Sequence, residues 1–266
     1  MLMLGLWLGL AGPALAQKPQ GAFDAGCAGP AAYSAVADDD TNGIRAAVHC
    51  ALTTGRKWVL LVGYGDPVGI PVNGPQLRQR MDQLGLTPHI VAIMYREEWY
   101  GQARRGELPV PQTIEGLDIV HAFGSAQQCA LKAAFGKPIL YVDGFVNSDK
   151  AFGYGWYQPL PLCTDLFGFE AYVERGRTWA GKIPPLFQYH RQVYPTLPLV
   201  IIGQGFRTYD PRDAWSEGPT AELVDKTLDL MADPGVVSIF WFTWQSRATM
   251  EGLDRKPQLV ERIWKR

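Results

Sequence analysis

Two adjacent glutamates stand directly after an apolar run in the first half of the chain. Residues 89–94 read HIVAIM, and residues 95–100 read YREEWY. A carboxyl group at the end of a β-strand can act as a general acid or base, and an aromatic ring beside it can stack on a sugar. Two glutamates after a strand are also common in solvated loops and helix caps. We select Glu98 as the candidate general acid, and Glu97, Trp99 and Tyr100 as candidate substrate-binding residues.

Polar or aromatic residues also end most of the other predicted strands. These strand-end residues are Tyr64, Asp143, Glu170, Tyr172, Gln204 and Trp244. Barrels of alternating strands and helices carry their chemistry at the carboxyl ends of the strands, so the pattern predicts one shared site. Asp143 and Glu170 are the candidates for a second catalytic carboxylate, and the other four are candidates for substrate binding. Trp156 joins them, because it lies in the aromatic loop FGYGWY at 152–157.

Most of these candidates also have a purely structural explanation. Glu98 could form an ion pair with Arg96 or Arg104, and Glu170 with Arg207. Asp143 could cap a turn, and Gln204 could hydrogen-bond a neighbouring loop. Trp241 and Trp244 are three residues apart on one apolar strand, so they should face opposite sides and only one can line a pocket. The sequence leaves both sets of explanations open.

Apolar runs alternate with segments of helical period along the chain. The predicted strands are 33–37, 58–64, 89–95, 138–145, 165–172, 199–206 and 236–244, and the predicted helices are 41–53, 74–84, 125–135, an interrupted helix from 172–177 towards 194, and 220–231. Such alternation predicts the α/β class and favours a (β/α)8 TIM barrel. With seven clear strands, either an eighth lies between Gln17 and Ala32 or the barrel is irregular or incomplete at its N-terminal strands. An open doubly wound sheet is the alternative, but no G-x-G-x-x-G turn follows a strand.

Three residues mark helix ends by known capping chemistry. Asp40 and Thr220 precede helical segments and can accept hydrogen bonds from N–H groups of the first turn. Gly136 follows the helix predicted over 125–135 and is typical of a helix C-terminus. The polar stretch 101–112 contains two prolines and predicts a surface loop.

The composition fits one exported domain. The chain has 266 residues, 47% of them hydrophobic, and a net charge of −1 at pH 7. This is enough apolar material for one large core and too little positive charge for a nucleic-acid partner. Residues 1–16 are apolar and end in Ala-Leu-Ala, which predicts a signal peptide cleaved after Ala16, although the segment lacks a basic start and an uncleaved anchor stays open. We expect residues 17–266 to be one secreted or periplasmic domain without a membrane span.

The four cysteines, Cys27, Cys50, Cys129 and Cys163, all lie in the predicted mature part. In an oxidising compartment they predict two disulfides with three possible pairings, of which we favour the pairing of neighbours; buried free thiols are the alternative. No Cys-x-x-Cys, His-x-His or His-Glu-x-x-His spacing occurs, so we expect no metal and no other cofactor. A Gly-x-Ser-x-Gly nucleophile turn is also missing, which argues against a serine hydrolase.

From about residue 58 to residue 250, the chain resembles the clan A glycoside hydrolases. In that clan the fourth strand ends in the acid/base Glu, the seventh in the nucleophile Glu, and the eighth in an aromatic residue, usually Trp. Glu98, Gln204 and Trp244 fall on the matching strands, and Tyr172 matches a polar aromatic after the sixth. The run EEWY from Glu97 is also similar to the Asp-Glu-Pro-Tyr run of some sugar hydrolases. There are two departures: Glu97 replaces the Asn of the family, and the amide of Gln204 cannot form a glycosyl ester.

Three mechanisms are compatible with this resemblance. In the first, Glu98 protonates the leaving group and Asp143 or Glu170 activates water, which requires carboxyl groups roughly 6.5 to 9.5 Å apart. In the second, the acetamido group of the substrate is the nucleophile, positioned by Gln204 or Tyr172. In the third, the barrel binds carbohydrate without cleaving it. We expect a monomeric glycoside hydrolase of a β-linked polysaccharide or oligosaccharide; the alternative is a carbohydrate-binding or cell-envelope protein on a degenerate barrel.

Overall fold

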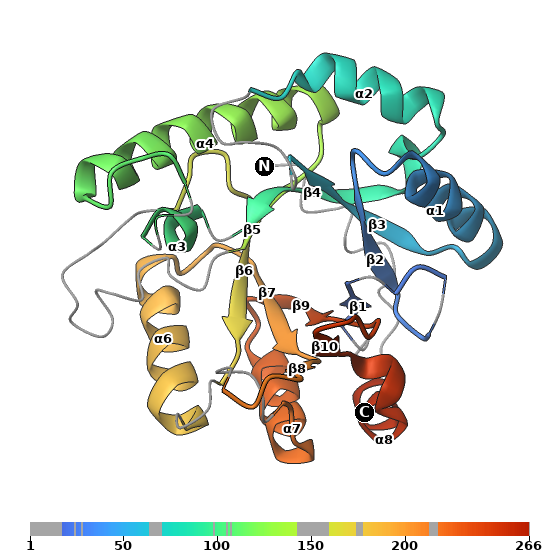
Figure 1. Cartoon of the computed structure of the whole chain (residues 1–266), viewed down its shortest axis with the longest axis vertical. Helices are drawn as coiled ribbons and strands as arrows, with labels where there is room; N and C mark the ends of the chain where they lie inside the picture. The colour runs from blue at the N-terminus through green and yellow to red at the C-terminus, as the bar shows by residue number, and fades with distance from the viewer. Residues whose placement is uncertain are drawn as a thin grey trace.

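The computed structural model is a closed barrel of parallel β-strands surrounded by helices (Figure 1). It describes residues 18–23, 25–27, 29–63, 71–97, 99–104, 106, 108–142, 160–173, 178–212 and 218–265. In pairing order the barrel strands are β1 (Gln20–Ala22), β2 (Tyr33–Ala37), β3 (Lys57–Val62), β4 (Ile90–Glu97), β5 (Ile139–Val142), β6 (Leu166–Ala171), β7 (Leu199–Gln204) and β9 (Val236–Phe242). Because β9 pairs with β1, the ring is complete. The predicted TIM barrel is confirmed, and β1 is the strand that lay hidden between Gln17 and Ala32.

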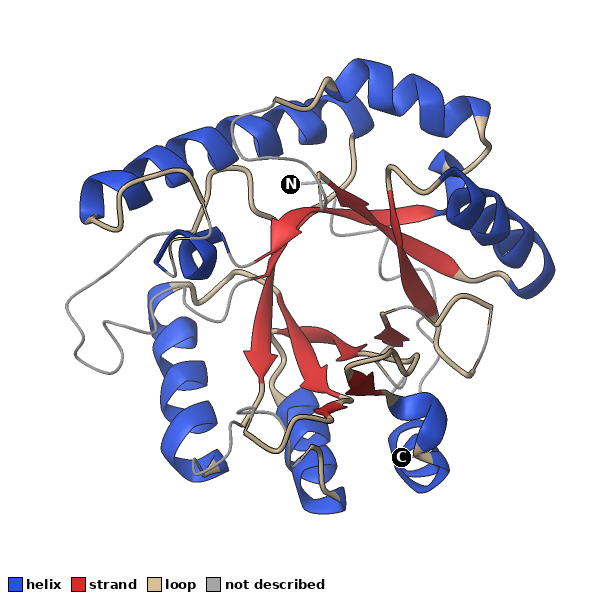
Figure 2. Cartoon of the chain, viewed as in Figure 1, coloured by secondary structure: helices blue, strands red, loops and turns tan. Residues whose placement is uncertain are grey.

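Helices cover the outside of the barrel, as Figure 2 shows in blue. The α-helices are α1 (Thr41–Thr54), α2 (Gly74–Gln83), α3 (Trp99–Arg104), α4 (Ile114–Phe135), α6 (Trp179–Val193), α7 (Ala221–Asp229) and α8 (Pro257–Trp264). The predicted caps are confirmed. The side chains of Asp40 and Thr220 accept hydrogen bonds from the first turns of α1 and α7, and Gly136 ends α4 with φ 62°.

Several helix boundaries differ from the predictions. α4 begins at Ile114 instead of residue 125, α3 enters the predicted loop 101–112, and α8 was not predicted. Two glycines in the first half of α4 weaken the helical pattern. One of them, Gly124, is fixed by packing, because a Cβ there would lie 1.1 Å from the ring of Trp99. α6 begins at Trp179, and the predicted helical residues 174–177 lie outside the described part.

Side chains of the strands divide between two hydrophobic layers. The outer layer joins the strands to the helices, and the inner layer fills the barrel. The inner layer consists of Phe23, Tyr33, Val59, Ala92, Met94, Leu140, Val142, Leu166, Tyr172, Val200, Ile202, Phe206 and Phe240. Gly21 makes room for it, since a Cβ there would lie 2.3 Å from the ring of Tyr33 and 2.5 Å from that of Phe240. The interior of the barrel is therefore a packed core, and the place to look for a site is the carboxyl end of its strands, which we call the open end.

A bulge changes the register at the carboxyl end of β4. Met94 pairs with Leu140, but the next pairing joins Glu97 to Val142, so β4 has one more residue than β5 over this stretch. Arg96, inside the bulge, has φ 51°. A side chain at positive φ is strained, and such bulges are common beside active sites. The bulge brings Glu97 level with Val142, a residue of the inner layer.

A disulfide and a buried arginine hold the connection between β1 and β2, which has no helix among its described residues. The guanidinium of Arg56 donates to the carbonyl oxygens of Gly26 and Gly29. Cys27 is bonded to Cys50 of α1. These links fix this connection to the barrel, as packing of a helix fixes other connections.

The second disulfide joins Cys129 of α4 to Cys163, shortly before β6. Both bonds follow the predicted pairing of neighbours along the chain. No helix in the described part of the chain is long and apolar enough to cross a membrane. The predicted signal peptide, residues 1–16, lies outside the described residues.

Candidate active site

Two of the predicted site residues lie on the lumen side at the carboxyl end of β6. Glu170 is four residues after Leu166 of the inner layer and therefore on the same face of β6, and it pairs in register with Ile202, another inner-layer residue. Tyr172 follows the strand and is 9% exposed. Its ring packs edge-on against Phe206, with centroids 5.6 Å apart. A carboxylate and a phenol thus stand together at the open end of the barrel.

Gln204 ends β7 on the same side, and both polar atoms of its amide form hydrogen bonds with the backbone. Oε1 accepts a hydrogen bond from the backbone N–H of Val173 at 3.3 Å, and Nε2 donates to the carbonyl oxygen of Phe206 at 3.2 Å. The residue is 1% exposed. Gln204 therefore ties the segment after β6 to the segment after β7, as expected for its loop hydrogen bond. Each polar atom of the Gln204 amide thus already bonds to a backbone group inside the protein.

Other predicted site residues cannot be placed as side chains. Glu98, Asp143, Tyr64 and Trp156 lie outside the described residues. For Glu97 and Tyr100 the backbone is described: Glu97 ends β4 opposite Val142, and Tyr100 belongs to α3. The structure thus brings Glu170, Tyr172 and Gln204 together and leaves the carboxylates after β4 and β5 to experiment.

Trp99 is a core residue rather than a surface for sugar stacking. It is 3% exposed and belongs to the outer layer. The indole N–H donates to the carbonyl oxygen of Tyr95 at 3.1 Å, and the ring packs edge-on against Tyr95 and Tyr141. The predicted substrate-binding role is not supported, because the helical turn after β4 directs this ring towards α4 and Gly124.

Trp244 also lies in the outer layer, away from the lumen. It packs edge-on against Trp264 of α8 at a centroid distance of 5.6 Å, and its ring fills the space beside Gly29. Trp241 lies in the same layer, fully buried. The expectation that the two tryptophans face opposite sides was wrong, because both lie in the outer layer. β9 ends at Phe242, so strand alternation no longer applies at Trp244.

Instead, phenylalanines line the lumen between β1, β9, β7 and β6. Phe23 packs against Phe242 at 5.3 Å, Phe242 against Phe206 at 5.5 Å, and Phe206 against Tyr172. Sequence analysis did not select these phenylalanines as site residues. Their alternation with outward-facing residues is the signal that could have found Phe242.

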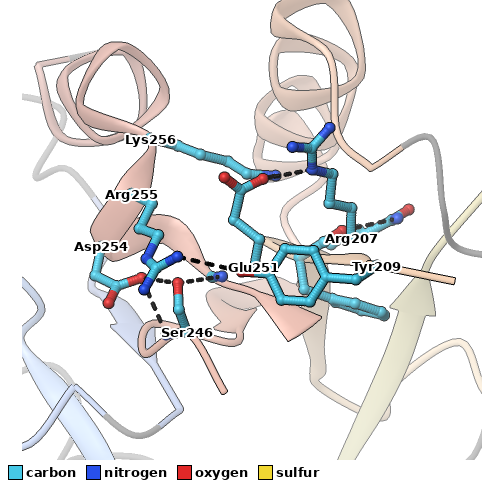
Figure 3. Close-up of polar contacts among 10 residues, drawn as sticks. Arg207, Tyr209, Ser246, Glu251, Asp254, Arg255 and Lys256 are labelled. Carbon is cyan, nitrogen blue, oxygen red and sulfur yellow. Dashed lines mark hydrogen bonds and ion pairs between the residues drawn. The ribbon is translucent and has the colours of Figure 1, made fainter. Parts of the chain in front are cut away.

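A short antiparallel sheet covers this aromatic side of the open end. It pairs β8 (Arg207–Thr208) with β10 (Met250–Glu251). Met250 packs against the inner layer, whereas Glu251 pairs with Arg207 at 2.5 Å on the other face of the sheet, as Figure 3 shows. Lys256 approaches the same carboxylate at 3.7 Å. Burial lowers the pKa of Lys256, and Glu251 partly offsets this effect.

The described residues contain no group of three or more histidine, cysteine or acidic side chains that could hold a metal ion. His190, one of the four histidines, is buried in the outer layer beside the rings of Phe167 and Phe169, far from chemistry at the lumen. Burial lowers its pKa to about 3. The arrangement at the open end offers carboxyl, phenol and aromatic groups, which suits acid–base chemistry and carbohydrate contacts.

Solved structures with a similar fold are glycoside hydrolases. A calcium-binding mutant of Bacteroides uniformis beta-glucuronidase 2 has a TM-score of 0.56 and 18% sequence identity, over 82% of this chain and 27% of that chain. The endo-beta-mannanase/endo-beta-glucanase of Prevotella bryantii has a TM-score of 0.50 and 10% identity, over 88% of this chain and 41% of that chain. This chain therefore spans about a quarter to two fifths of these neighbours.

No protein-family model matches the sequence, and no curated protein matches it. At identities of 10% and 18%, the structural likeness establishes the fold alone. The chain is a (β/α)8 barrel of the kind found in glycoside hydrolases.

Proposed function

We propose that the protein cleaves O-glycosidic bonds of a polysaccharide or oligosaccharide, with Glu98 as general acid and Glu170 as the second carboxylate. The observation that carries the proposal is the position of Glu170, an ionisable residue on the lumen face at the carboxyl end of β6. Carboxyl groups at this end of such barrels are where hydrolysis of sugars takes place. The similarity of the fold to glycoside hydrolase barrels supports the same class of reaction.

The proposed course is inversion, because the amide of Gln204 cannot form a glycosyl ester as a carboxylate nucleophile does. This amide instead hydrogen-bonds the backbone at Val173 and Phe206. In our proposal, Glu170 removes a proton from water while Glu98 protonates the leaving oxygen. Asp143 is the other candidate for the base. In a substrate-assisted route, Gln204 or Tyr172 would position an acetamido group.

A second candidate function is carbohydrate binding without cleavage. The structural role of Gln204 favours this candidate. In the clan A glycoside hydrolases the seventh strand supplies the nucleophile, whereas here its last residue, Gln204, links two loops by hydrogen bonds. In this candidate, Tyr172 and the residues around it bind sugar and Glu170 only accepts hydrogen bonds from hydroxyl groups.

The test is hydrolysis of a panel of β-linked polysaccharides by the full chain and by four variants. Glu97→Gln, Glu98→Gln and Glu170→Gln remove one carboxyl group each, and Glu222→Gln, an exposed residue of α7 paired with Lys226, is the matched control. We expect Glu98→Gln and Glu170→Gln to lose at least about a hundredfold in kcat/KM, as the loss of a general acid or base does. Glu97→Gln is included because the bulge places Glu97 at an inner-layer register position.

Each outcome selects one candidate. Inversion at the anomeric carbon, read by NMR of the first product, supports the proposed course, whereas retention would point to substrate assistance. Activity that survives in both Glu98→Gln and Glu170→Gln would refute the assigned roles. Saturable oligosaccharide binding without turnover, weakened by Tyr172→Ala, would establish the binding function.

A further inference from the structure

Small side chains form the lumen face of β2. Tyr33, Ala35 and Ala37 are alternate residues of this strand, and Tyr33 belongs to the inner layer, so the two alanines also face the lumen. We call Ala35 and Ala37 the alanine wall. β2 and β6 are the second and sixth strands of the ring, and Figure 1 shows them on opposite sides of the barrel. The alanine wall therefore stands across the lumen from the strand that carries Glu170.

The alanine wall is accessible, whereas most of the inner layer is buried. Ala35 and Ala37 are partly exposed, and so is Leu61 of β3, which pairs with Ala37. Ala35 is the central residue of β2. Val91 and Val237 also pack against the inner layer and are partly exposed, but they stand second in their strands, at the amino end. Among the described residues, access at β2 thus extends from the carboxyl end to the middle of the strand.

The pairing of the strands explains this access. β2 pairs with β3 through five residues, but with β1 through the single pair of Gly21 and Tyr33. After Ala22 the chain stays beside β9, since the N–H of Phe23 donates to the carbonyl oxygen of Trp241 at 3.0 Å. Beyond Tyr33, β2 therefore has no strand partner on the side of β1 in the described part of the chain, and the alanine wall is left accessible.

Packing does not explain why the residues of the alanine wall are small. At two other lumen positions a neighbouring side chain takes up the space: a Cβ on Gly21 would lie 2.3 Å from the ring of Tyr33, and one on Gly168 would lie 2.4 Å from Val142. Ala92, the alanine of the inner layer on β4, is 2% exposed. Protein interiors are close-packed, so small residues that stay partly exposed leave room for a ligand.

Large rings occupy the other side of the open end. Phe242 packs between Phe23 and Phe206, and Phe206 packs against Tyr172. These rings belong to or follow β9, β1, β7 and β6. A sugar whose glycosidic bond lies at Glu170 therefore has room towards β2, and much less towards β7 and β9.

We propose that Ala35 and Ala37 determine which sugars the candidate active site accepts, because the ring of the bound sugar residue lies against them. The inference rests on the proposed function and adds the part of the lumen that selects the substrate. A hexopyranose carries a hydroxymethyl group that the corresponding pentopyranose lacks. Larger side chains at the alanine wall would thus exclude the hexose and still admit the pentose.

The first part of the test needs no substrate. Ala35→Leu and Ala37→Leu add volume at the alanine wall, and Ala92→Leu adds the same volume inside the packed inner layer. We expect Ala92→Leu to lower the midpoint of urea unfolding, because overpacking strains a close-packed core. The other two variants should keep the midpoint of the wild type. Equal falls in all three variants would overturn the proposal, because the space beside β2 would then be filled.

The second part compares a β-linked hexoside with the corresponding pentoside, by hydrolysis or, without turnover, by calorimetric binding. We expect Ala35→Leu and Ala37→Leu to lower kcat/KM or affinity for the hexoside at least about tenfold more than for the pentoside, mainly through a higher KM. Ala46→Leu, at an exposed alanine of α1, is the matched control and should leave both values unchanged.

The remaining outcomes separate this inference from the proposed function. An equal loss for both sugars, or no loss for either, would overturn the selective role of the alanine wall and leave the proposed function standing. A wild type that neither cleaves nor binds any saccharide would refute the proposed function, and the inference with it, even when urea unfolding behaves as expected.

Discussion

Protonation of His190 should make the stability of this barrel depend on pH. The residue lies on α6, is 2% exposed, and has its ring 4.6 Å from that of Phe167 and 5.6 Å from that of Phe169. Burial among apolar groups lowers its pKa to about 3, whereas a histidine in an unfolded chain titrates near 6.5. The folded state therefore binds fewer protons than the unfolded state between these two values.

The sign and size of the effect follow from linkage. His190 leaves stability unchanged above the unfolded pKa, and its contribution falls as the pH drops below about 6.5, because protons bind preferentially to the unfolded chain. At pH 5 the loss is about 2 kcal/mol, and it approaches about 5 kcal/mol near pH 3, where the folded state also protonates. Half of this loss would already be a large part of the stability of an ordinary domain.

The assay is urea unfolding of the wild type and His190→Leu between pH 8 and pH 5, with disulfides intact. The difference in unfolding free energy between the two proteins isolates His190, because the other titrating groups cancel. We expect this difference to shift by about 2 kcal/mol in favour of His190→Leu at pH 5. A difference that stays constant with pH, or an NMR titration of His190 in the folded protein with a midpoint near 6.5, would refute the reasoning.

Three other predictions concern packing and covalent links. Gln204→Glu should lower the unfolding free energy at pH 8 by about 2 to 3 kcal/mol, because the carboxylate cannot donate to the carbonyl of Phe206. The loss should be smaller at pH 5, because burial favours the protonated carboxyl group, which can donate. Equal losses at pH 8 and pH 5 would argue against a buried site. Gly124→Ala should cost about 1 to 3 kcal/mol in urea unfolding, since its Cβ would overlap the ring of Trp99, and an unchanged midpoint would contradict this packing. Replacing Cys129 and Cys163 together by serine should lower the unfolding free energy by about 3 kcal/mol, measured without reductant against the oxidised wild type; a loss below about 1 kcal/mol would show that the link adds little.

The sequence predicted most of the barrel because every barrel strand except β1 carries a local signal. Apolar β-branched runs bounded by capping residues such as Asp40 and Thr220 specify strands and helices without help from distant residues. β1 has only three residues and a glycine at its centre, so it has no such signal. It is a strand because β9 and β2 offer it partners, which is a tertiary effect.

The candidate site was harder to predict, because the positions of its side chains depend on tertiary structure. A strand end can be located by pattern, but the direction of a side chain after that end depends on the next turn of the backbone. Glu170 lies within β6, where alternation holds, and its lumen position follows from the sequence. Trp99 and Trp244 come after their strands end, and the chain turns both into the outer layer. The double hydrogen bond of Gln204 depends on two loops that no local pattern describes.

Closure of the ring between β1 and β9 makes the first and last parts of the chain dependent on each other. Gln20 pairs with Ile239, its side chain donates to Ile263, and the indole of Trp241 donates back to Gln20. These contacts span more than 200 residues of sequence. Contacts between residues so far apart in the sequence form late in folding. Nearly the entire polypeptide must therefore leave the ribosome before β1 can pair with a strand on both sides. Until then, the half-made barrel has an open edge, which is the form most exposed to aggregation and to capture by chaperones.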